Sequence, residues 1–286
     1  AVGGTLGIII PPSIVFVIYG STNGVSISKL LMSGMLPGIL TAVVLCLYGY
    51  VVAKKENFPK SFDQFSLKRV LKSLKGAVWA LMMPLIILGG IYGGIFTPTE
   101  SAMIACAYGL VVSFFVTKEL TVKNFFDVVS KTAASTANVT VMFLAAQVFG
   151  FLIAYYDITT TIANFFVAVS PNWIIFMGLV FILLTITGMF MEVGATNVIL
   201  SPLLAPVAAA FGIDPIHFGM VFVFLLALGQ ATPPFGSTMF IACGISGERV
   251  AAVIRRLLPF VLVEYACALV FAYVPWFSTF LPSLMA

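Results

Sequence analysis

The stretch that decides the fold reads Leu226-Ala-Leu-Gly-Gln-Ala-Thr-Pro-Pro-Phe-Gly-Ser-Thr-Met-Phe240. It lies inside an apolar segment, roughly 218–245, that is long enough to cross a bilayer as a helix. Pro233 and Pro234 supply no backbone N–H groups and clash with the preceding turn, at about 3 kcal/mol or more each in a helix interior. The sequence therefore predicts an unwound centre, whose free carbonyls need protein, water or an ion because lipid cannot satisfy them. Secondary transporters hold coupling ions at discontinuous helices of this kind.

The same pattern occurs near the start of the chain. Leu6-Gly7-Ile8-Ile9-Ile10-Pro11-Pro12 lies 222 positions before Leu228-Gly229-Gln230-Ala231-Thr232-Pro233-Pro234, and the same offset aligns Leu36-Pro37 with Leu258-Pro259. Two matches at one spacing indicate a duplicated unit, so we expect a second broken helix here. Because the chain opens inside this copy, without Met or a basic leader, we expect it to be the C-terminal portion of a longer protein.

Composition decides the broad class. Of the 286 residues, 61% are hydrophobic and 8% are charged, and the mean hydropathy is +1.15. These values predict a polytopic helical membrane protein whose surroundings are a lipid bilayer. The four cysteines have no CxxC spacing and the only histidine is His217, so the sequence indicates neither a disulfide framework nor a histidine metal cluster. Without a nucleophile–base pair, a phosphate loop or a nucleic-acid surface, we expect no enzymatic activity, no cofactor and no nucleic-acid partner.

Hydropathy and loop signals divide the chain into six parts. In order, they are 1–29 (second half of a broken helix), 30–76 (span plus basic arm), 77–135 (two scaffold spans plus a second arm), 136–172 (scaffold span and outer segment), 173–246 (hairpin and broken helix) and 247–286 (final span). We expect the first and fifth parts to form a transport domain. The two arms, at 65–75 and 118–135, have one apolar face and are expected to be separate helices lying along the membrane surface.

Basic residues orient these segments. All of the 14 lysines and arginines except Lys29 fall in three loops, around 54–75, 118–131 and 249–256. The positive-inside rule places these loops in the cytoplasm and the turn at 157–172 outside. The alternation then works only if residues 173–211 enter the membrane and return as a hairpin. Because its tip carries no Lys or Arg, we expect a re-entrant tip rather than a cytoplasmic loop.

The tip of this hairpin offers groups that suit a monovalent cation. The residues that interrupt its apolar pattern are Gly188, Gly194, Thr196 and Asn197. Small residues allow close backbone approach, and neutral oxygens hold such an ion weakly. The residues of the broken helix expected to face this tip are Gly229, Thr232 and Pro233. One sodium ion would satisfy both sets of carbonyls; alternatively, glycine and proline only kink the helices and threonine caps them internally.

Two acidic residues lie within predicted membrane segments, where a charge costs on the order of 2.5–3.5 kcal/mol at the centre. Glu192, beside the hairpin tip, is a candidate for binding substrate, binding an ion or gating. The alternative is that its side chain only forms a hydrogen bond to local backbone. Glu264 is expected to make an interhelical contact. Ser13 and Ser237 are further candidates for substrate binding or gating.

Two other polar residues are expected to be structural. Glu100 lies at a helix start, where Thr97 or Thr99 is available as the cap and the helix dipole favours an acid. His217 is expected to mark an outer interface, because no catalytic partner for it is apparent.

Three motifs carry a family resemblance. They are Gly3-Gly-Thr-Leu-Gly-Ile-Ile-Ile-Pro-Pro-Ser13, Gly90-Ile-Tyr-Gly-Gly-Ile-Phe-Thr-Pro-Thr-Glu-Ser-Ala102 and Thr232-Pro-Pro-Phe-Gly236. Together they resemble the large membrane subunit of TRAP transporters, the tripartite ATP-independent periplasmic systems for organic acids, and the resemblance runs over the whole chain. It implies an all-α polytopic, elevator-type fold of the ion-transporter superfamily, with inverted repeats, a re-entrant hairpin and broken helices.

The resemblance also implies a function. It is the import of small organic anions, such as carboxylates and sugar acids, across the bacterial inner membrane with sodium as the coupling ion. The implied partners are a small membrane subunit and a soluble periplasmic substrate-binding protein. A second sodium site would lie between the tip at 188–197 and the break at 229–233. A first would lie between an earlier hairpin, absent here, and the break at 3–12, with Gly3, Gly4, Thr5 and Gly7 as candidate ligands.

Two alternatives remain open from the sequence. One is a stand-alone ion-coupled anion carrier of the same superfamily, which needs no small subunit or binding protein. The other is a membrane scaffold or enzyme whose helix breaks are structural kinks only.

Overall fold

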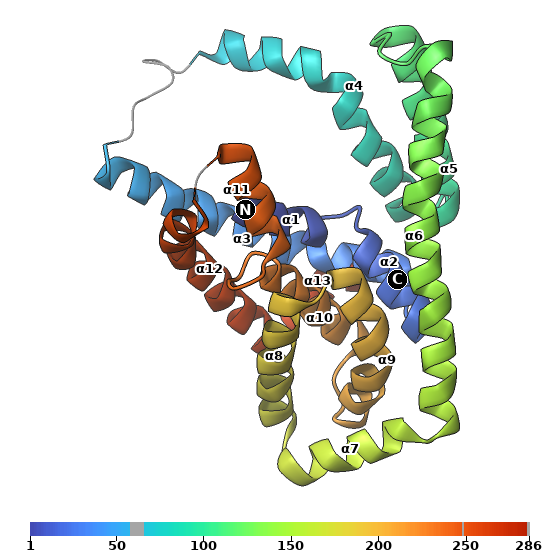
Figure 1. The fold of residues 1–286 in the computed structure, drawn as a ribbon, viewed down its shortest axis with the longest axis vertical. Helices are drawn as coiled ribbons and strands as arrows, with labels where there is room; N and C mark the ends of the chain where they lie inside the picture. Colours follow the sequence, from blue (N-terminus) through green and yellow to red (C-terminus); the bar gives the residue numbers. More distant parts are fainter. Residues whose placement is uncertain (58–65, 248, 285–286) are drawn as a thin grey trace. The chain divides into compact units, whose positions relative to one another are not determined.

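A computed structural model describes residues 1–57, 66–247 and 249–284, and every regular element in these ranges is helical (Figure 1). The elements in chain order are α1 (Val2–Ile9), α2 (Ile14–Asn23), α3 (Ile27–Lys55), α4 (Leu67–Tyr92), α5 (Pro98–Val111), the π-helical turn η1 (Val112–Val116), α6 (Val122–Tyr155), α7 (Ile158–Val169), α8 (Trp173–Phe190), α9 (Val193–Ala210), α10 (Pro215–Gly229), α11 (Ser237–Ser246), α12 (Val250–Tyr273) and α13 (Trp276–Ser283). The predicted all-α class is confirmed.

The chain divides into two compact units. The first combines residues 1–48 with 139–286, and the second comprises residues 49–138. Both broken helices and the hairpin belong to the first unit. The six-part division of the sequence stays a prediction, although three of its boundaries, at 29/30, 76/77 and 135/136, fall within helices α3, α4 and α6.

The two predicted broken helices are present and share their layout. Residues 10–13 separate α1 from α2, which are bent by 45°, and residues 230–236 separate α10 from α11. Adding 222 to the residue numbers of α2 gives 236–245, and each of these bounds is one residue from that of the observed α11. The same addition moves the start of α3 to within one residue of the start of α12. The bonds Pro11–Pro12 and Pro233–Pro234 are both cis. The duplicated unit is therefore a broken helix together with the helix that follows it.

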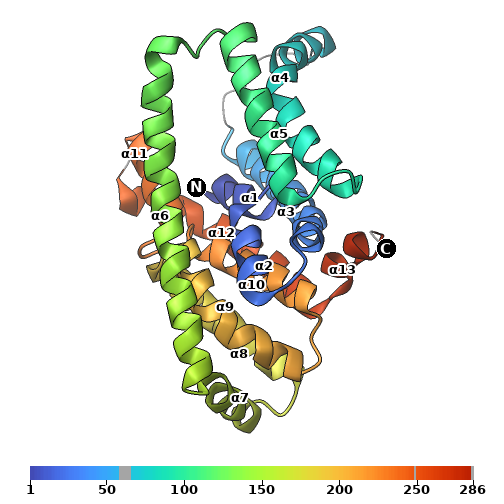
Figure 2. The same ribbon diagram turned by 90° about the vertical axis from the view of Figure 1, so that its right-hand side faces the viewer.

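Helix α10 is the centre of the first unit. Every residue from His217 to Gly229 is buried, because α1, α2, α8, α9, α12 and α13 all pack against it. In both ribbon views α10 lies among these helices (Figures 1 and 2). An all-round apolar surface is what a helix enclosed on every side requires.

His217 lies inside the protein, and its predicted position at an outer membrane interface stays a prediction. Its side chain is 1% exposed. Nδ1 lies 2.7 Å from Ser278 Oγ and Nε2 lies 3.2 Å from the Ala272 carbonyl oxygen. The imidazole therefore ties the start of α10 to the end of α12 and to α13.

Helices α8 and α9 form the predicted hairpin, with Met191 and Glu192 as its turn. Helix α8 packs mainly on α10, whereas α9 packs on α2, α10 and α7. Figure 1 shows α7 crossing the end of the hairpin opposite the turn. Each helix of the hairpin has 18 residues, a length of about 27 Å, and is long and apolar enough to cross a membrane. The re-entrant tip stays a prediction.

The two surface arms are not separate helices, contrary to the sequence prediction. The first arm is the start of α4, which runs unbroken from Leu67 to Tyr92, and the second is the start of α6, from Val122 to Tyr155. The only breaker at the first junction is Gly76, which costs about 1 kcal/mol relative to alanine in a helix and does not stop it. A change from amphipathic to apolar pattern therefore marks a change of surroundings along one helix.

Helix α5 begins with the capping arrangement expected for Glu100, and its cap is Thr97 rather than Thr99. Thr97 N and Oγ1 donate to Glu100 Oε2 at 2.8 and 2.9 Å, and Thr97 Oγ1 accepts from Glu100 N at 3.3 Å. These bonds satisfy donors that the first helical turn leaves free. Glu100 therefore has the structural role predicted for it.

The C-terminal segment bends where a single span was expected. Helix α12 starts at Val250 and takes in most of the basic 249–256 segment, and α13 leaves it at 63° after Pro275. In the part of the chain that the structure describes, five helices are long and apolar enough to cross a membrane, or up to seven if each bent pair counts as one span.

Candidate functional site

The break between α10 and α11 is a closed loop held by its own polar groups. Thr238 N and Oγ1 both donate to the Gln230 carbonyl oxygen, at 3.1 and 2.7 Å. Gly236 N donates to the Thr232 carbonyl oxygen at 3.2 Å, and Ser237 Oγ donates to Gln230 Oε1 at 2.5 Å. The exposed Ser237, a candidate for substrate or gating, therefore positions the buried Gln230 side chain.

Gly188 and Gly229 meet where α8 crosses α10. A Cβ atom on Gly229 would lie 2.5 Å from Gly188 C and Cα, and one on Gly188 would lie 3.1 Å from Gly229 Cα. Only glycine allows two backbones to approach this closely. The structure thus brings together these two predicted sodium ligands, one from the hairpin and one from the break.

Thr232 links the same break to α12. Its hydroxyl donates to the Leu228 carbonyl oxygen at 2.8 Å and lies 3.0 Å from Tyr265 Oη. Because a hydroxyl has one hydrogen, Tyr265 is the donor in the second bond. One lone pair of Thr232 Oγ1 then remains for a ligand. Pro233, next in the loop, is half-buried.

The hairpin tip is shorter than the sequence predicted. Gly194, Thr196 and Asn197 lie in the first turns of α9, so the expected interruption through 197 was wrong. Glu192 is the N-cap, accepting from Ala195 N at 2.9 Å, and Thr196 Oγ1 donates to the Glu192 carbonyl oxygen at 2.8 Å. The alternative weighed for Glu192, a bond to local backbone, is therefore present.

Asn197 belongs to a different contact from Gly188. Its side chain is fully buried, and Nδ2 donates to the Val15 carbonyl oxygen in α2 at 2.9 Å. Its Oδ1 has no hydrogen-bond partner among the described residues, and neither has Oγ of buried Ser13 at the start of α2. Asn197 thus joins the hairpin to the first broken helix, whereas the sequence grouped it with the second.

The candidate ligands of the first site lie within a helix. Gly3, Gly4, Thr5 and Gly7 belong to α1, and the break starts after Ile9. The unwound segment expected at 3–12 is therefore confined to 10–13. Among these residues only Thr5 is buried, and its hydroxyl lies 2.6 Å from Glu264 Oε1 in α12. This contact confirms the interhelical role expected for Glu264.

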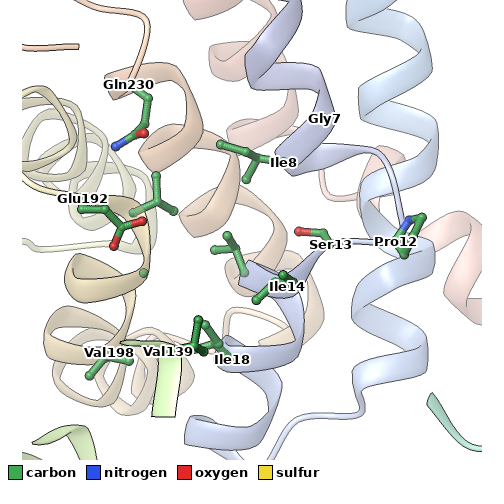
Figure 3. A pocket seen from close by; sticks show the side chains of 13 residues that line it. Gly7, Ile8, Pro12, Ser13, Ile14, Ile18, Val139, Glu192, Val198 and Gln230 are labelled. Atoms are coloured by element: carbon green, nitrogen blue, oxygen red, sulfur yellow. The ribbon is translucent and has the colours of Figure 1, made fainter. Parts of the chain in front are cut away.

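A cavity of about 430 Å³ lies between the first broken helix, the hairpin tip and the second break (Figure 3). Its lining residues are Gly7, Ile8, Pro12, Ser13, Ile14, Val15, Ile18, Val139, Glu192, Val193, Gly194, Val198 and Gln230. In Figure 3, Glu192 and Gln230 lie on one side, and Ser13 and Ile14 lie on the other. The cavity therefore unites residues from both copies of the duplicated unit.

Two helix N-termini open onto this cavity. The first residues of α2 (Ile14) and of α9 (Val193) both line it. The first turn of a helix carries free N–H groups and a partial positive charge, which attract anions. Within the described residues, no three His, Cys, Asp or Glu side chains gather as a metal site. The two helix N-termini therefore offer backbone N–H groups that suit a small anion.

Sequence reasoning missed two residues of this site. Gln230 lines the cavity, and its Nε2 lies 3.4 Å from the Met191 carbonyl oxygen in the hairpin turn. Tyr265 bonds to Thr232. A glutamine inside an apolar broken helix is a usable signal, since buried polar groups in membranes are costly. No local signal marks Tyr265, because its partner is 33 residues away.

Comparison with known proteins identifies the family to which the chain is similar. The family model described as tripartite ATP-independent periplasmic transporter, DctM component, matches residues 1–277. The isethionate TRAP transporter permease protein DctMQ of Oleidesulfovibrio alaskensis is 40% identical over 275 residues, covering 96% of this chain and 43% of the relative. The sialic acid TRAP transporter permease protein SiaT of Haemophilus influenzae is 34% identical over 280 residues, covering 98% and 45%.

A further relative is the C4-dicarboxylate TRAP transporter large permease protein DctM of Vibrio cholerae. It is 35% identical over 302 residues, covering 99% of this chain and 66% of the relative. The chain thus spans between 43% and 66% of the length of these three relatives. Because the family model matches nearly the whole chain, this multi-pass membrane protein belongs to the DctM-component family of TRAP transporters.

Proposed function

We propose that the protein is part of the large permease subunit of a TRAP transporter in the bacterial inner membrane. It imports small organic anions that a periplasmic binding protein delivers, and it works beside a small membrane subunit. Family membership supports this proposal, as do relatives named for isethionate, sialic acid and C4-dicarboxylates. All three named substrates are organic acids.

The observation that carries the proposal is the cavity between the two copies of the duplicated unit. Its volume, about 430 Å³, is that of a site for a small molecule. The N-termini of α2 and α9 supply N–H groups for the anion, and Gln230 and Ser13 supply polar side chains. The Glu192 carboxylate also lines the cavity and accepts from Ala195 N of its own helix.

We further propose sodium coupling through two sites of neutral oxygens. The second site would take carbonyls around Gly188 and Gly229 and the Thr232 hydroxyl, whose remaining lone pair is available. Other candidates near it are Gly194, Thr196 and Pro233. The first site would use oxygens of α1 and of the break after it, with Gly3, Gly4, Thr5 and Gly7 as candidates. Two buried oxygens without a hydrogen-bond partner among the described residues are Ser13 Oγ, at the start of α2, and Asn197 Oδ1, at the contact of α9 with α2.

An elevator movement needs the substrate-binding elements to travel as one body. Helices α1, α2, α8 and α9 all pack on α10 within the first unit, which supports such a body. The interlocked contacts at Gly188 with Gly229 and at Asn197 with Val15 hold the hairpin to both broken helices. The elements around the cavity would therefore move together with bound anion and sodium.

The test is to fill the cavity without disturbing the packing. Ile14 lines the cavity and is 68% exposed, so Ile14→Trp projects into it at little structural cost. Ile39→Trp is the control, because Ile39 is 47% exposed on α3 and does not line the cavity. The full-length permease is reconstituted in vesicles with its small subunit and binding protein, and uptake of an organic acid is measured under an inward sodium gradient.

We expect Ile14→Trp to lose most of the uptake and Ile39→Trp to keep it, with no uptake in the wild type when potassium replaces sodium. Equal uptake by the two variants would remove the cavity from the transport path. Uptake in the wild type that does not respond to sodium would refute the coupling.

A further inference from the structure

A second cavity, of about 630 Å³, lies at the other ends of two helices that line the first. Helices α2 and α9 pack against each other, and the first residues of both line the cavity described above. The second cavity, called here the far pocket, is lined by residues of the end of α2 and the turn after it (19–25), of the second half of α9 (202–209) and of the first turn of α10 (215–218). Its volume is that of a site for a small molecule.

The start of α10 has no free backbone N–H group to offer the far pocket. Pro215 has none by its chemistry. Ile216 N and His217 N both donate to Asp214 Oδ1, at 2.8 and 3.0 Å. Phe218 N donates to the Asp214 carbonyl oxygen at 2.9 Å. The groups with which a helix N-terminus binds anions are therefore already occupied by Asp214.

The N–H donors of α2 and α9 are also committed. The N–H groups of residues 24 and 25 both donate to the Gly20 carbonyl oxygen. Asn23 Nδ2 uses both of its hydrogens, in bonds to the Tyr19 carbonyl oxygen at 2.9 Å and to Ser201 Oγ at 2.8 Å. The lining residues of α9 are either prolines or lie inside the helix, where N–H groups bond along the backbone.

Acceptors, by contrast, remain free in the far pocket. Tyr19 Oη and Thr22 Oγ1 are buried and have no hydrogen-bond partner among the described residues. Pro206 follows Pro202 by four positions in α9 and has no N–H, so the Pro202 carbonyl oxygen lacks its usual helical donor. The last carbonyls of α2 lack helical donors as well, because the helix ends at Asn23. A ligand must therefore bring hydrogen-bond donors of its own.

The electrostatics of the far pocket favour a positive charge. The C-terminal end of α2, which carries a partial negative charge, lines it. Asp214 places a carboxylate next to Pro215, at its edge. The rings of Tyr19 and Phe218 also line the pocket, and aromatic faces attract cations. No Lys or Arg is among the described residues that form the lining.

We propose that the far pocket binds a small organic ammonium ion, R–NH3+, at a site separate from the anion cavity. The ammonium group brings the N–H donors and the positive charge that this lining lacks. Its hydrocarbon part would lie against the alanines and prolines of α9. Two sources carry this group, a soluble primary amine and the headgroup of phosphatidylethanolamine. Binding there requires neither transport nor sodium, so its test does not depend on the proposed function.

Thermal unfolding of the full-length permease with its small subunit, in phosphatidylcholine nanodiscs and at constant sodium, measures binding. Ethylammonium chloride is the probe. Tetramethylammonium chloride, which has the charge but no N–H, and ethanol, which has the ethyl group but no charge, are the controls. A ligand that binds only the folded state raises the melting temperature, so we expect a rise with ethylammonium that exceeds both controls. Equal melting temperatures in the three solutions would overturn the proposal and leave water as the occupant.

Two neighbouring alanines near the end of α9 locate the effect. Ala209 is exposed and lines the far pocket, so Ala209→Trp fills it at little structural cost. Ala210 is also exposed but does not line the pocket, and Ala210→Trp is the matched control. The rise with ethylammonium should be lost in Ala209→Trp and kept in Ala210→Trp. A rise of the same size in both variants would place the amine elsewhere and contradict the proposal.

The combined variant Tyr19→Phe, Thr22→Val tests the two hydroxyls. Without amine it should be at least as stable as the wild type, because it removes hydroxyls that have no partner among the described residues. The ethylammonium concentration that gives half of the rise should increase about tenfold or more, as expected when hydrogen bonds to a charged group are lost. An unchanged response of the folded variant would refute the match between donors and acceptors.

Lipid composition separates the two sources of the ammonium group. If the lipid headgroup is the ligand, the wild type should unfold at a higher temperature in phosphatidylethanolamine nanodiscs than in phosphatidylcholine, and ethylammonium should have no further effect there. If a soluble amine is the ligand, ethylammonium should raise the melting temperature equally in both lipids. Ala209→Trp should abolish either effect.

Discussion

At the scale of single residues, the crossing of α8 and α10 depends on the missing side chains of two glycines. A methyl group on Gly229 would meet the Gly188 backbone at 2.5 Å, and neither backbone can move without disturbing the hairpin. We expect Gly229→Ala to destabilise the protein by about 1–3 kcal/mol or more, the range for overpacked cores. Thermal unfolding in detergent measures the change.

Two further variants, one expected to be milder and one control, test whether close packing is the cause. Gly188→Ala should be milder, because its methyl group would lie 3.1 Å from Gly229 Cα. Gly244→Ala in α11 is the matched control, since nothing lies within 4 Å of its added methyl group. The control should unfold at or slightly above the wild-type temperature, because alanine favours helix by up to about 1 kcal/mol. Equal melting temperatures for all three variants would contradict the close-packing account.

Thr232 provides the residue-scale test of the second sodium site. Thr232→Val removes one oxygen at nearly constant volume and should cost a site of weak ligands roughly 1–3 kcal/mol. In the complete transporter, the sodium concentration for half-maximal uptake should rise about tenfold to a hundredfold. Thr232→Ser keeps the oxygen and should resemble the wild type.

Tyr265→Phe separates ion binding from packing. It removes the hydrogen bond to Thr232 and keeps the threonine oxygen, so it should lower stability by about 0.5–1.5 kcal/mol with little effect on sodium dependence. If Thr232→Val folds and responds to sodium as the wild type does, Thr232 is not a ligand.

At the scale of elements, the start of α6 was predicted to be a cytoplasmic arm. Because this start is continuous with the rest of the helix, the two ends of α6 should lie on opposite sides of the membrane. Thr121 precedes α6 and Tyr156 follows it, so the two positions mark its ends. In a variant whose four cysteines are replaced, Thr121→Cys should be labelled by an impermeant thiol reagent only from the cytoplasmic side. Tyr156→Cys, at a position 67% exposed, should be labelled only from outside.

The companion position Ser61, also predicted to be cytoplasmic, lies outside the described residues, so Ser61→Cys tests the first basic loop by labelling alone. Labelling of Thr121→Cys from outside would reverse the orientation that the basic residues predict. Labelling of both ends of α6 from one side would show that the helix does not cross the membrane.

At the scale of the whole molecule, the proposed dependence on a small membrane subunit separates a TRAP permease from a stand-alone carrier. The exposed apolar surface of α4, α5 and η1 includes Leu85, Met103 and Phe115, each more than 60% exposed. Such surface faces either lipid or another membrane protein. We expect the full-length permease, expressed with its neighbouring small membrane protein, to purify with it in constant ratio through affinity and size-exclusion steps. A permease that purifies alone and still takes up substrate without a binding protein would favour the stand-alone carrier.

The sequence by itself determined the class of the protein and the positions of its two helix breaks. Both follow from local physics: apolar composition requires a membrane environment, and consecutive prolines remove N–H donors wherever the chain places them. The repeat spacing also predicted a duplicated unit, and the structure shows that an equivalent helix follows both breaks. The extent of helices was less predictable, because α4 and α6 continue through changes of hydropathy pattern that do not stop hydrogen bonding along the backbone.

Only the tertiary structure decided which residues meet. Sequence adjacency placed Asn197 with the second break, yet α9 packs on α2 and brings Asn197 to Val15, whereas α8 brings Gly188 to Gly229. The pairing of Thr5 with Glu264 had no local signal, because contacts across 259 positions depend on how helix faces pack. Local chemistry fixes where a chain can break, and packing of distant helices fixes which of the freed polar groups share a site.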